Sequence, residues 1–340
     1  MIKDKIYSII PDGIIYFIAK GLCLQRLLQQ FISYHCRKNH FENIIHALAY
    51  TKIAINTGSA NSQHYELPVE YFRLVLGKHL KYSCSYWEKA EMKLGDAEEA
   101  MLKQYLLRAD IKDNQTLLEL GCGWGSLTLY IASHCPSSKI IAVSNSSSQQ
   151  SYIEAQAKKR GLSNIQVICA DINTFEPPHH FDRIISVEMI EHIRNHRAIL
   201  TKIHKWLLPK GKLFVHHFCH NKYLYLFDDK KDGWMAKNFF TGGMMPCENM
   251  LSLFAQGFKE CQTWDVNGMH YYHTAQSWLD LHKKNKKAII EIFSTHYGSS
   301  QAILFYQYWR FFYLACMALF SFKRGEEWYV KHSLFEKESL

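Results

Sequence analysis

The stretch that decides the fold is LLELGCGWGSLTLYIA, residues 117–132. An apolar run ends in Glu119, three glycines follow at Gly121, Gly123 and Gly125, and a segment with helical spacing begins directly after them. Glycine lets the backbone turn tightly and approach a ligand closely, so this order predicts a nucleotide-binding turn between a strand and a helix. The spacing is GxGxG rather than GxGxxG, and no Walker lysine follows. The pattern therefore favours a nucleoside ligand without a pyrophosphate.

The sequence around this loop alternates between strand-like and helix-like segments. Short apolar runs rich in β-forming residues lie at 116–121, 139–144, 165–170, 181–187 and 211–218. Helix-like segments separate them at 125–134, 147–160 and 190–208. This alternation predicts βαβ units and a parallel sheet, and the nearly continuous apolar strands predict cover on both faces. Two further strands are predicted at 260–267 and 328–335.

Helices are predicted on both sides of this sheet-forming region, over residues 1–110 and in most of 274–322. Segment 303–322 is strongly apolar, but Gln307 and Arg310 interrupt it. The clean run that remains is shorter than the roughly 20 residues that a membrane span needs, so we expect a buried amphipathic helix. The first residues lack a small-residue cleavage site, so no secretory signal is expected.

Composition excludes several classes of protein. Hydrophobic residues make up 48% of the 340 residues and charged residues 21%, which rules out a disordered chain. None of the ten cysteines forms a CxxC pair, which argues against a zinc ribbon or a thioredoxin motif and predicts a reducing, cytoplasmic location. The HHFCH run at 216–220 predicts no metal site, because neighbouring side chains point to opposite faces of a strand. The formal net charge is +9, but no RNA-binding motif accompanies it, so no nucleic-acid partner is expected.

A second candidate for function follows the fourth predicted strand, in VEMIEH at 187–192. Glu188, Glu191 and His192 stand at the carboxyl end of that strand, where α/β sheets place their sites. If a helix begins at residue 188, the two glutamates share one face, because they are three positions apart. Such groups can accept the proton of a reacting molecule. The alternative is that the acids only stabilise a helix N-terminus through its dipole.

These motifs together resemble a known family. E-x-G-x-G-x-G after a first strand resembles motif I of the class I methyltransferases that use S-adenosyl-L-methionine (SAM). Three segments resemble the cyclopropane fatty acid synthase superfamily: KYSCSYW at 81–87, VEMIEH at 187–192 and VHHF at 215–218. Five more are similar to its plant coclaurine N-methyltransferase-like group: YELPVEYFRLVLGK at 65–78, FFTGGMMP at 239–246, NGMHYYHT at 267–274, YWRFF at 308–312 and GEEWYV at 325–330. The resemblance covers about residues 65–335.

The resemblance implies an α/β fold: a Rossmann-like, seven-stranded class I methyltransferase sheet whose last strand is antiparallel. Residues 1–110 would form a helical N-terminal region that covers the cofactor. Residues 111–340 would form the methyltransferase core, with helical insertions at 219–258 and 268–322 around the acceptor pocket. The oligomeric state stays open.

The resemblance also implies SAM as the methyl donor, and it assigns residues to it. Tyr82 and Ser83 would cover the cofactor, and Glu119 would face its sulfonium or amino-acid part beside the three glycines of the loop. Asp171 with the Ile172 backbone would contact the adenine. Most class I enzymes bind the ribose hydroxyls with an acid after the second strand. This chain has VSNSSSQQ there, so Asn145 and Gln149 take that place, and both can hydrogen bond to a diol.

For the methyl acceptor, the resemblance leaves two hypotheses. In the first, Glu188, Glu191 and His192 hold and deprotonate a small-molecule amine, and Glu188 favours this hypothesis because cyclopropane synthases usually lack that first glutamate. Aromatic side chains would then roof the acceptor pocket: Phe239, Phe240, Tyr271, Tyr308 and Trp309.

In the second hypothesis, the acceptor is an unsaturated acyl chain of a phospholipid, and the enzyme is peripheral at the membrane. The base is then a bicarbonate ion, held by Cys84, Glu191, His216, Tyr271 and the Phe218 backbone. The net charge would help such an enzyme dock on anionic lipid, as would seven Lys and Arg against three Asp and Glu in residues 1–60.

Overall fold

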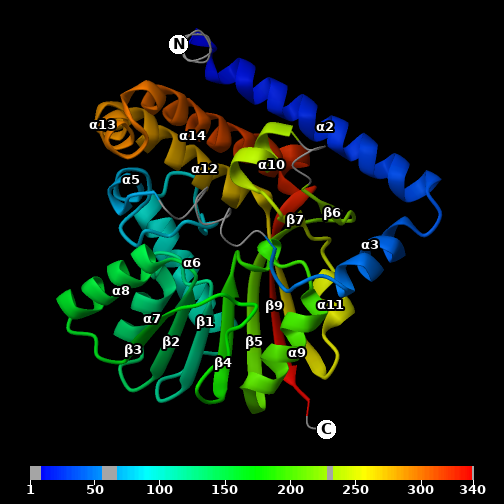
Figure 1. The fold of residues 1–340 in the computed structure, drawn as a ribbon, viewed down its shortest axis with the longest axis vertical. Helices are drawn as coiled ribbons and strands as arrows, with labels where there is room; N and C mark the ends of the chain where they lie inside the picture. The colour runs from blue at the N-terminus through cyan, green and yellow to red at the C-terminus, as the bar shows by residue number, and fades with distance from the viewer. Residues whose placement is uncertain (1–8, 56–66, 228–232, 339–340) are drawn as a thin grey trace.

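The computed structural model describes residues 9–55, 67–227 and 233–338 (Figure 1). Its centre is a seven-stranded sheet in the order β3-β2-β1-β4-β5-β9-β8. The strands are β1 Thr116–Leu120, β2 Lys139–Ser144, β3 Ile165–Cys169, β4 Phe181–Val187, β5 Leu207–His220, β8 Phe258–Val266 and β9 Trp328–Lys337. Strands β1 to β5 are mutually parallel, and β9 runs antiparallel to both of its neighbours. The predicted class I methyltransferase topology is confirmed.

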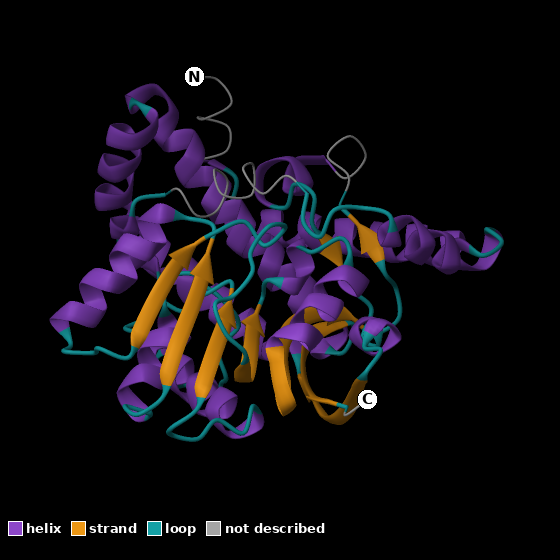
Figure 2. Cartoon of the chain, turned by 60° about the horizontal axis from the view of Figure 1, so that its bottom comes forward, coloured by secondary structure: helices purple, strands orange, loops and turns teal. Residues whose placement is uncertain are grey.

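Helices cover both faces of this sheet, because successive strand residues point to opposite sides (Figure 2). Leu117 and Phe214 belong to a core shared with α6 and α7. Their neighbours Leu118 and Leu213 belong to a second core, shared with α9 and α11. The helices named here are α6 Leu94–Arg108, α7 Ser126–His134, α8 Ser147–Lys159, α9 His196–Trp206 and α11 Met250–Phe254.

The connection after β4 differs from the prediction. A single helix over 190–208 is wrong: a short 3₁₀ turn, η2 Ile190–His192, comes first, and α9 begins only at His196. The Asn195 side chain sets this start, since it accepts a 2.9 Å hydrogen bond from the Ala198 amide. Glu188 has a left-handed φ of 48°, so no helix begins there, and Glu188 and Glu191 do not share a helix face.

A helical layer lies over the carboxyl ends of the strands (Figure 1). Its members are α2 Asp12–Cys36, α3 His40–Ala49, α5 Val69–Val75, α12 Gly268–Lys284, α13 Lys286–Tyr297 and α14 Ser299–Phe320. The segment between β5 and β8 adds β6 Tyr225–Leu226, α10 Gly233–Phe239 and β7 Met244–Met245, and the short turn η3 Phe322–Gly325 precedes β9. Helix α14 is the one helix in the described ranges that is long and apolar enough to cross a membrane, and half of its most apolar window is buried. Its contacts with α2, α12 and α13 are those of a core helix.

Candidate active site

A pocket opens where the parallel strands end, as expected for an α/β sheet. It encloses about 1240 Å³ of empty space, counting the part open to solvent. All predicted cofactor residues except Gly125 line it: Tyr82, Ser83, Glu119, Gly121, Gly123, Asn145, Gln149, Asp171 and Ile172. The pocket wall also includes Glu188 and His192. The glycine loop and the acid cluster therefore meet in one cavity.

The three glycines of the loop have different duties, although all have left-handed φ values of 53–78°. A Cβ on Gly121 would lie 2.8 Å from the Met189 side chain, and a Cβ on Gly125 would lie 2.6 Å from Ile153. A Cβ on Gly123 would meet no atom of the described residues within 4 Å. Gly125 thus serves the packing of α7 against α8, while Gly123 leaves the backbone open to a ligand.

The polar groups in the loop region fit a nucleoside that carries a cation. Glu119 is buried and accepts a hydrogen bond from the Thr128 hydroxyl, and burial raises the pKa of Glu119 to about 7. Gln149 is fixed by its Oε1, which accepts a 2.6 Å bond from Ser144 Oγ. Its Nε2 is buried and has no partner among the described residues, so it can donate to a ligand hydroxyl.

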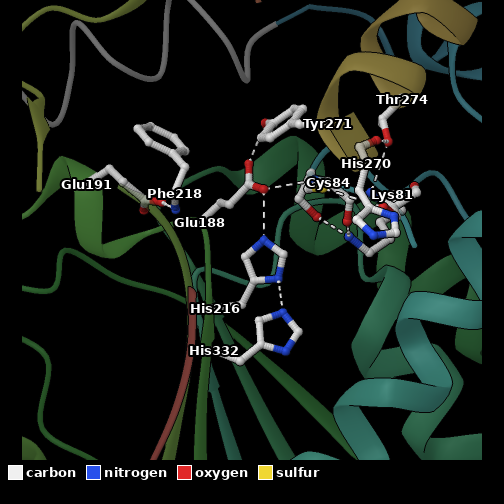
Figure 3. A network of polar contacts seen from close by, with 12 residues as sticks. Lys81, Cys84, Glu188, Glu191, His216, Phe218, His270, Tyr271, Thr274 and His332 are labelled. Atoms are coloured by element: carbon white, nitrogen blue, oxygen red, sulfur yellow. Dashed lines mark hydrogen bonds and ion pairs between the residues drawn. The ribbon is translucent and has the colours of Figure 1, made fainter. Parts of the chain in front are cut away.

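The Glu188 carboxylate is the centre of the acid cluster (Figure 3). Its Oε1 accepts hydrogen bonds from the Cys84 amide at 2.8 Å and from His216 Nε2 at 3.0 Å. Its Oε2 accepts a 2.6 Å bond from the Tyr271 hydroxyl. Burial raises the pKa of Glu188, but the Lys81 ammonium and these donors favour the ionised form.

Behind Glu188, a chain of polar groups fixes the proton positions. His332 Nδ1 lies 2.8 Å from Arg108 Nη1, and His332 Nε2 lies 2.9 Å from His216 Nδ1. Because arginine only donates, His332 accepts at Nδ1 and donates from Nε2 to His216. We therefore assign the His216 proton to Nε2, where it points at Glu188. Tyr105 lies beside His216, with its hydroxyl 2.9 Å from Nδ1.

Glu191 and His192 are placed differently. Glu191 is fully buried, its Oε1 accepts a 2.7 Å bond from the Phe218 amide, and its Oε2 has no partner among the described residues. Burial and the nearby Glu188 carboxylate raise the pKa of Glu191 well above its usual range, so its carboxyl group is neutral. His192 reaches the pocket and stacks on Phe240 at 4.9 Å, and burial lowers its pKa to about 4.

The residues predicted to hold bicarbonate do not fit that ion here. The Cys84 amide, His216 and Tyr271 all bind the Glu188 carboxylate, and the Phe218 amide binds Glu191. The chain thus supplies its own carboxylates to these donors. No group of three or more His, Cys, Asp and Glu side chains in the described ranges could hold a metal ion.

Several residues near the site were missed by the sequence reasoning. His332 and Arg108 carry no local motif, and His332 reaches His216 only through the β5–β9 register, in which the two are paired. Lys81 precedes the recognised YSC element, and its buried ammonium donates to Ser83 Oγ at 2.6 Å. Its place directly before that element was the one available signal.

The five aromatic rings predicted to roof the acceptor pocket do not line the cavity described above, in the part of the chain that the structure describes. Phe239 and Trp309 are core residues, whose rings pack 5.2 Å apart. Phe240 matches the predicted pocket role best of the five, because its ring stacks on the pocket residue His192. Tyr271 contributes its hydroxyl to Glu188 rather than a ring face.

Comparisons with known proteins agree with this geometry. The family model described as mycolic acid cyclopropane synthetase matches residues 54–328. The chain is 35% identical to (S)-coclaurine N-methyltransferase of Thalictrum flavum subsp. glaucum, over 99% of this chain and 95% of that relative. It is 29% identical to the cyclopropane-fatty-acyl-phospholipid synthase of Escherichia coli (strain K12), over 64% of this chain and 55% of that enzyme.

A solved structure extends the agreement to the whole fold. The crystal structure of coclaurine N-methyltransferase bound to N-methylheliamine and SAH (S-adenosylhomocysteine) matches with a TM-score of 0.93 and 34% identity, over 97% of both chains. The pocket residues fit SAM as the methyl donor. The chain belongs to the mycolic acid cyclopropane synthetase family and is a SAM-dependent methyltransferase.

Proposed function

We propose that this enzyme transfers the methyl group of SAM to the nitrogen of a small-molecule amine, with Glu188 as the proton acceptor and His192 as a hydrogen-bond partner of the amine. The Glu188 carboxylate carries this proposal, because it lies in the pocket wall with three donors holding it in place. Similarity to coclaurine N-methyltransferases over nearly the full chain supports the same class of acceptor.

An amine acceptor needs a base, since it is mostly protonated at neutral pH and then has no free lone pair. Glu188 takes the proton from the ammonium group, so that the N–H bond breaks and its electron pair stays on nitrogen. SAM, when bound, supplies an electrophilic methyl carbon on a sulfonium. The amine nitrogen forms the new N–C bond as the S–C bond breaks, and the sulfur leaves as a neutral thioether.

His192 and Glu191, the other two residues of the VEMIEH segment, are both neutral near pH 7 but have different roles. His192 has its pKa lowered to about 4 by burial, so it is neutral near pH 7 and can accept a hydrogen bond from the amine. Glu191 is neutral and fixes the η2 turn through the Phe218 amide, which sets the position of His192. Burial raises the pKa values of both carboxyl groups, and such shifts are typical of catalytic sites.

A panel of methyl acceptors tests this function. The protein is incubated with methyl-labelled SAM and either secondary and tertiary amines or vesicles that contain unsaturated phospholipids. We expect label in an amine, and we expect Glu188→Gln to transfer far less of it. Gly123→Asp, which should not bind SAM, gives the background. Label in the acyl chains would overturn the proposal in favour of the lipid enzyme.

A further inference from the structure

The outer face of α2 is an exposed apolar surface. Eight large side chains on it are 51–78% exposed: Ile14, Phe17, Ile18, Leu22, Leu24, Leu28, Phe31 and Ile32. The helix lies along the outside of the helical layer (Figure 1). Contiguous apolar patches of this size on a monomer usually mark an interaction site.

The charged residues of α2 are not on this face. Asp12 binds Arg310 and Lys283, Lys20 lies 5.1 Å from the Phe322 ring, and Arg26 lies 5.2 Å from the Tyr225 ring. None of the exposed residues between positions 13 and 36 is Asp, Glu, Lys or Arg. A helix that lies on an anionic bilayer carries Lys and Arg on its polar face, free to meet lipid headgroups. Here the inner face is occupied by the protein, so the outer face is suited to another apolar protein surface.

The spacing of the exposed residues identifies that partner surface. Ile14, Gly21 and Leu28 recur at intervals of seven, and so do Phe17, Leu24 and Phe31. These two series are the a and d positions of a heptad repeat, which is the seam of a coiled coil. Within residues 9–55, 67–227 and 233–338 of one chain, no helix covers this seam, since its members are all exposed.

We propose that two copies of this chain dimerise by packing their α2 helices antiparallel along this seam, which we call the α2 seam. In that register every a residue meets a d residue of the other copy. The layers are Ile14 with Phe31, Phe17 with Leu28, and Gly21 with Leu24, each occurring twice about the two-fold axis.

Gly21 explains why the two α2 helices prefer to pack antiparallel rather than parallel. A Cβ on Gly21 would meet none of the described residues of its own chain within 4 Å, so they leave the space above it open. In a parallel pair two glycines would face each other and leave a void. In the antiparallel pair the Leu24 side chain of the other copy fills that space, which matches large residues with small ones.

The area of the seam agrees with a stable dimer. If a side chain of this size exposes about 180 Å² in full, the five large side chains of the seam present about 500 Å² per copy. Two copies would bury about 1,000 Å² in the seam alone, which is the lower limit for a specific interface, and Ile18 and Ile32 border the seam.

Mass measurement in solution tests the dimer. Light scattering after gel filtration should give twice the 39.9 kDa of the chain for the unmodified protein, and the monomer mass for Leu24→Glu. Leu107→Glu is the matched control, because Leu107 is 75% exposed on α6, away from the seam, and it should stay dimeric. A cooperative thermal unfolding transition of Leu24→Glu shows that the variant is folded, although loss of the dimer lowers its midpoint. A monomeric unmodified protein, or a Leu24→Glu dimer, would overturn the proposal.

Disulfide trapping tests the direction of the helices. Phe17→Cys combined with Leu28→Cys should give a cross-linked dimer under oxidation, while each single variant should behave as the unmodified chain with its native cysteines. Cross-linking of Phe17→Cys alone would overturn the antiparallel register. Sedimentation of a monomeric protein with phosphatidylglycerol vesicles, abolished by Leu24→Glu, would replace the dimer by a membrane contact.

Discussion

Replacing Glu188 in two ways separates its chemistry from its hydrogen bonds. In Glu188→Gln, the amide oxygen can accept from the Cys84 amide and His216, as Oε1 does now. The amide nitrogen replaces Oε2 and can donate to the Tyr271 hydroxyl, which can also act as an acceptor. This variant therefore keeps all three contacts and loses only the ability to take a proton. In Glu188→Ala, the same donors lose their acceptor.

The expected magnitudes follow from these contacts. Loss of a positioned general base costs about 10²–10⁴ in rate, so both variants should lose that much near pH 7. Each buried donor left without an acceptor costs about 1–3 kcal/mol. Tyr271 can turn its hydroxyl elsewhere, so two donors, the Cys84 amide and His216, lose their acceptor in Glu188→Ala. Water that enters the space can satisfy part of this loss. Glu188→Ala should therefore be about 2–4 kcal/mol less stable than Glu188→Gln.

Two assays measure these effects. Initial rates at saturating SAM are followed from pH 6 to pH 9, and Glu188→Gln should regain activity at high pH, where the amine loses its proton in solution. The free energy of unfolding is compared between the two variants in urea. Glu188→Gln within threefold of the unmodified enzyme at pH 7 would refute the assigned base. Equal stabilities of the two variants would refute the hydrogen-bond argument.

Three further predictions concern the cofactor loop and the buried histidines. Gly125→Ala should lower the free energy of unfolding by about 2–3 kcal/mol, because the new Cβ meets Ile153 and the φ is left-handed. Gly123→Ala should lower the free energy of unfolding by only about 1 kcal/mol but should weaken SAM binding in calorimetry. The reverse ranking would contradict the roles assigned to the two glycines. SAM affinity should fall about tenfold between pH 8 and pH 6 as Glu119, with its pKa raised to about 7, becomes protonated, and Glu119→Gln should show no such slope. Burial lowers the pKa of His217 to about 3, so this histidine stays neutral in the folded protein and takes up a proton only on unfolding. The free energy of unfolding should therefore decrease as the pH falls below about 6.5, by about 1.4 kcal/mol at pH 5.5. The urea midpoint of His217→Leu should decrease less steeply with falling pH than that of the unmodified protein.

The sheet is predictable from the sequence because each strand is a short apolar run between polar turns. Strand β4 begins and ends where the pattern places it, at Phe181 and Val187. The turn after it is not predictable, since a glutamate at φ 48° is an unusual occupant of the left-handed region. Strand β5 likewise begins four residues earlier than expected, because Leu207 pairs with Phe181 beside an irregularity in the ladder.

The candidate site also contains some residues that the sequence predicts and others that it does not. Cofactor residues such as Asn145 and Asp171 lie one and two positions after the ends of β2 and β3, so strand order alone brings them together in the pocket. Tyr271 and Cys84 reach Glu188 from α12 and from the segment before α6, and only the resemblance pointed to them. His332 had no signal, because its contact with His216 depends on tertiary pairing across more than a hundred residues.

The place of β9 in the sheet has a consequence for folding. It inserts between β5 and β8, both of which are synthesised earlier, and it brings His332 to the site. Until β9 is made, β5 and β8 present open edges that can pair with other nascent chains. Pairings as distant as Phe214 with Leu334 close slowly, since a long loop must be ordered first. The support for Glu188 is therefore completed only when β9 has been synthesised and has closed the sheet.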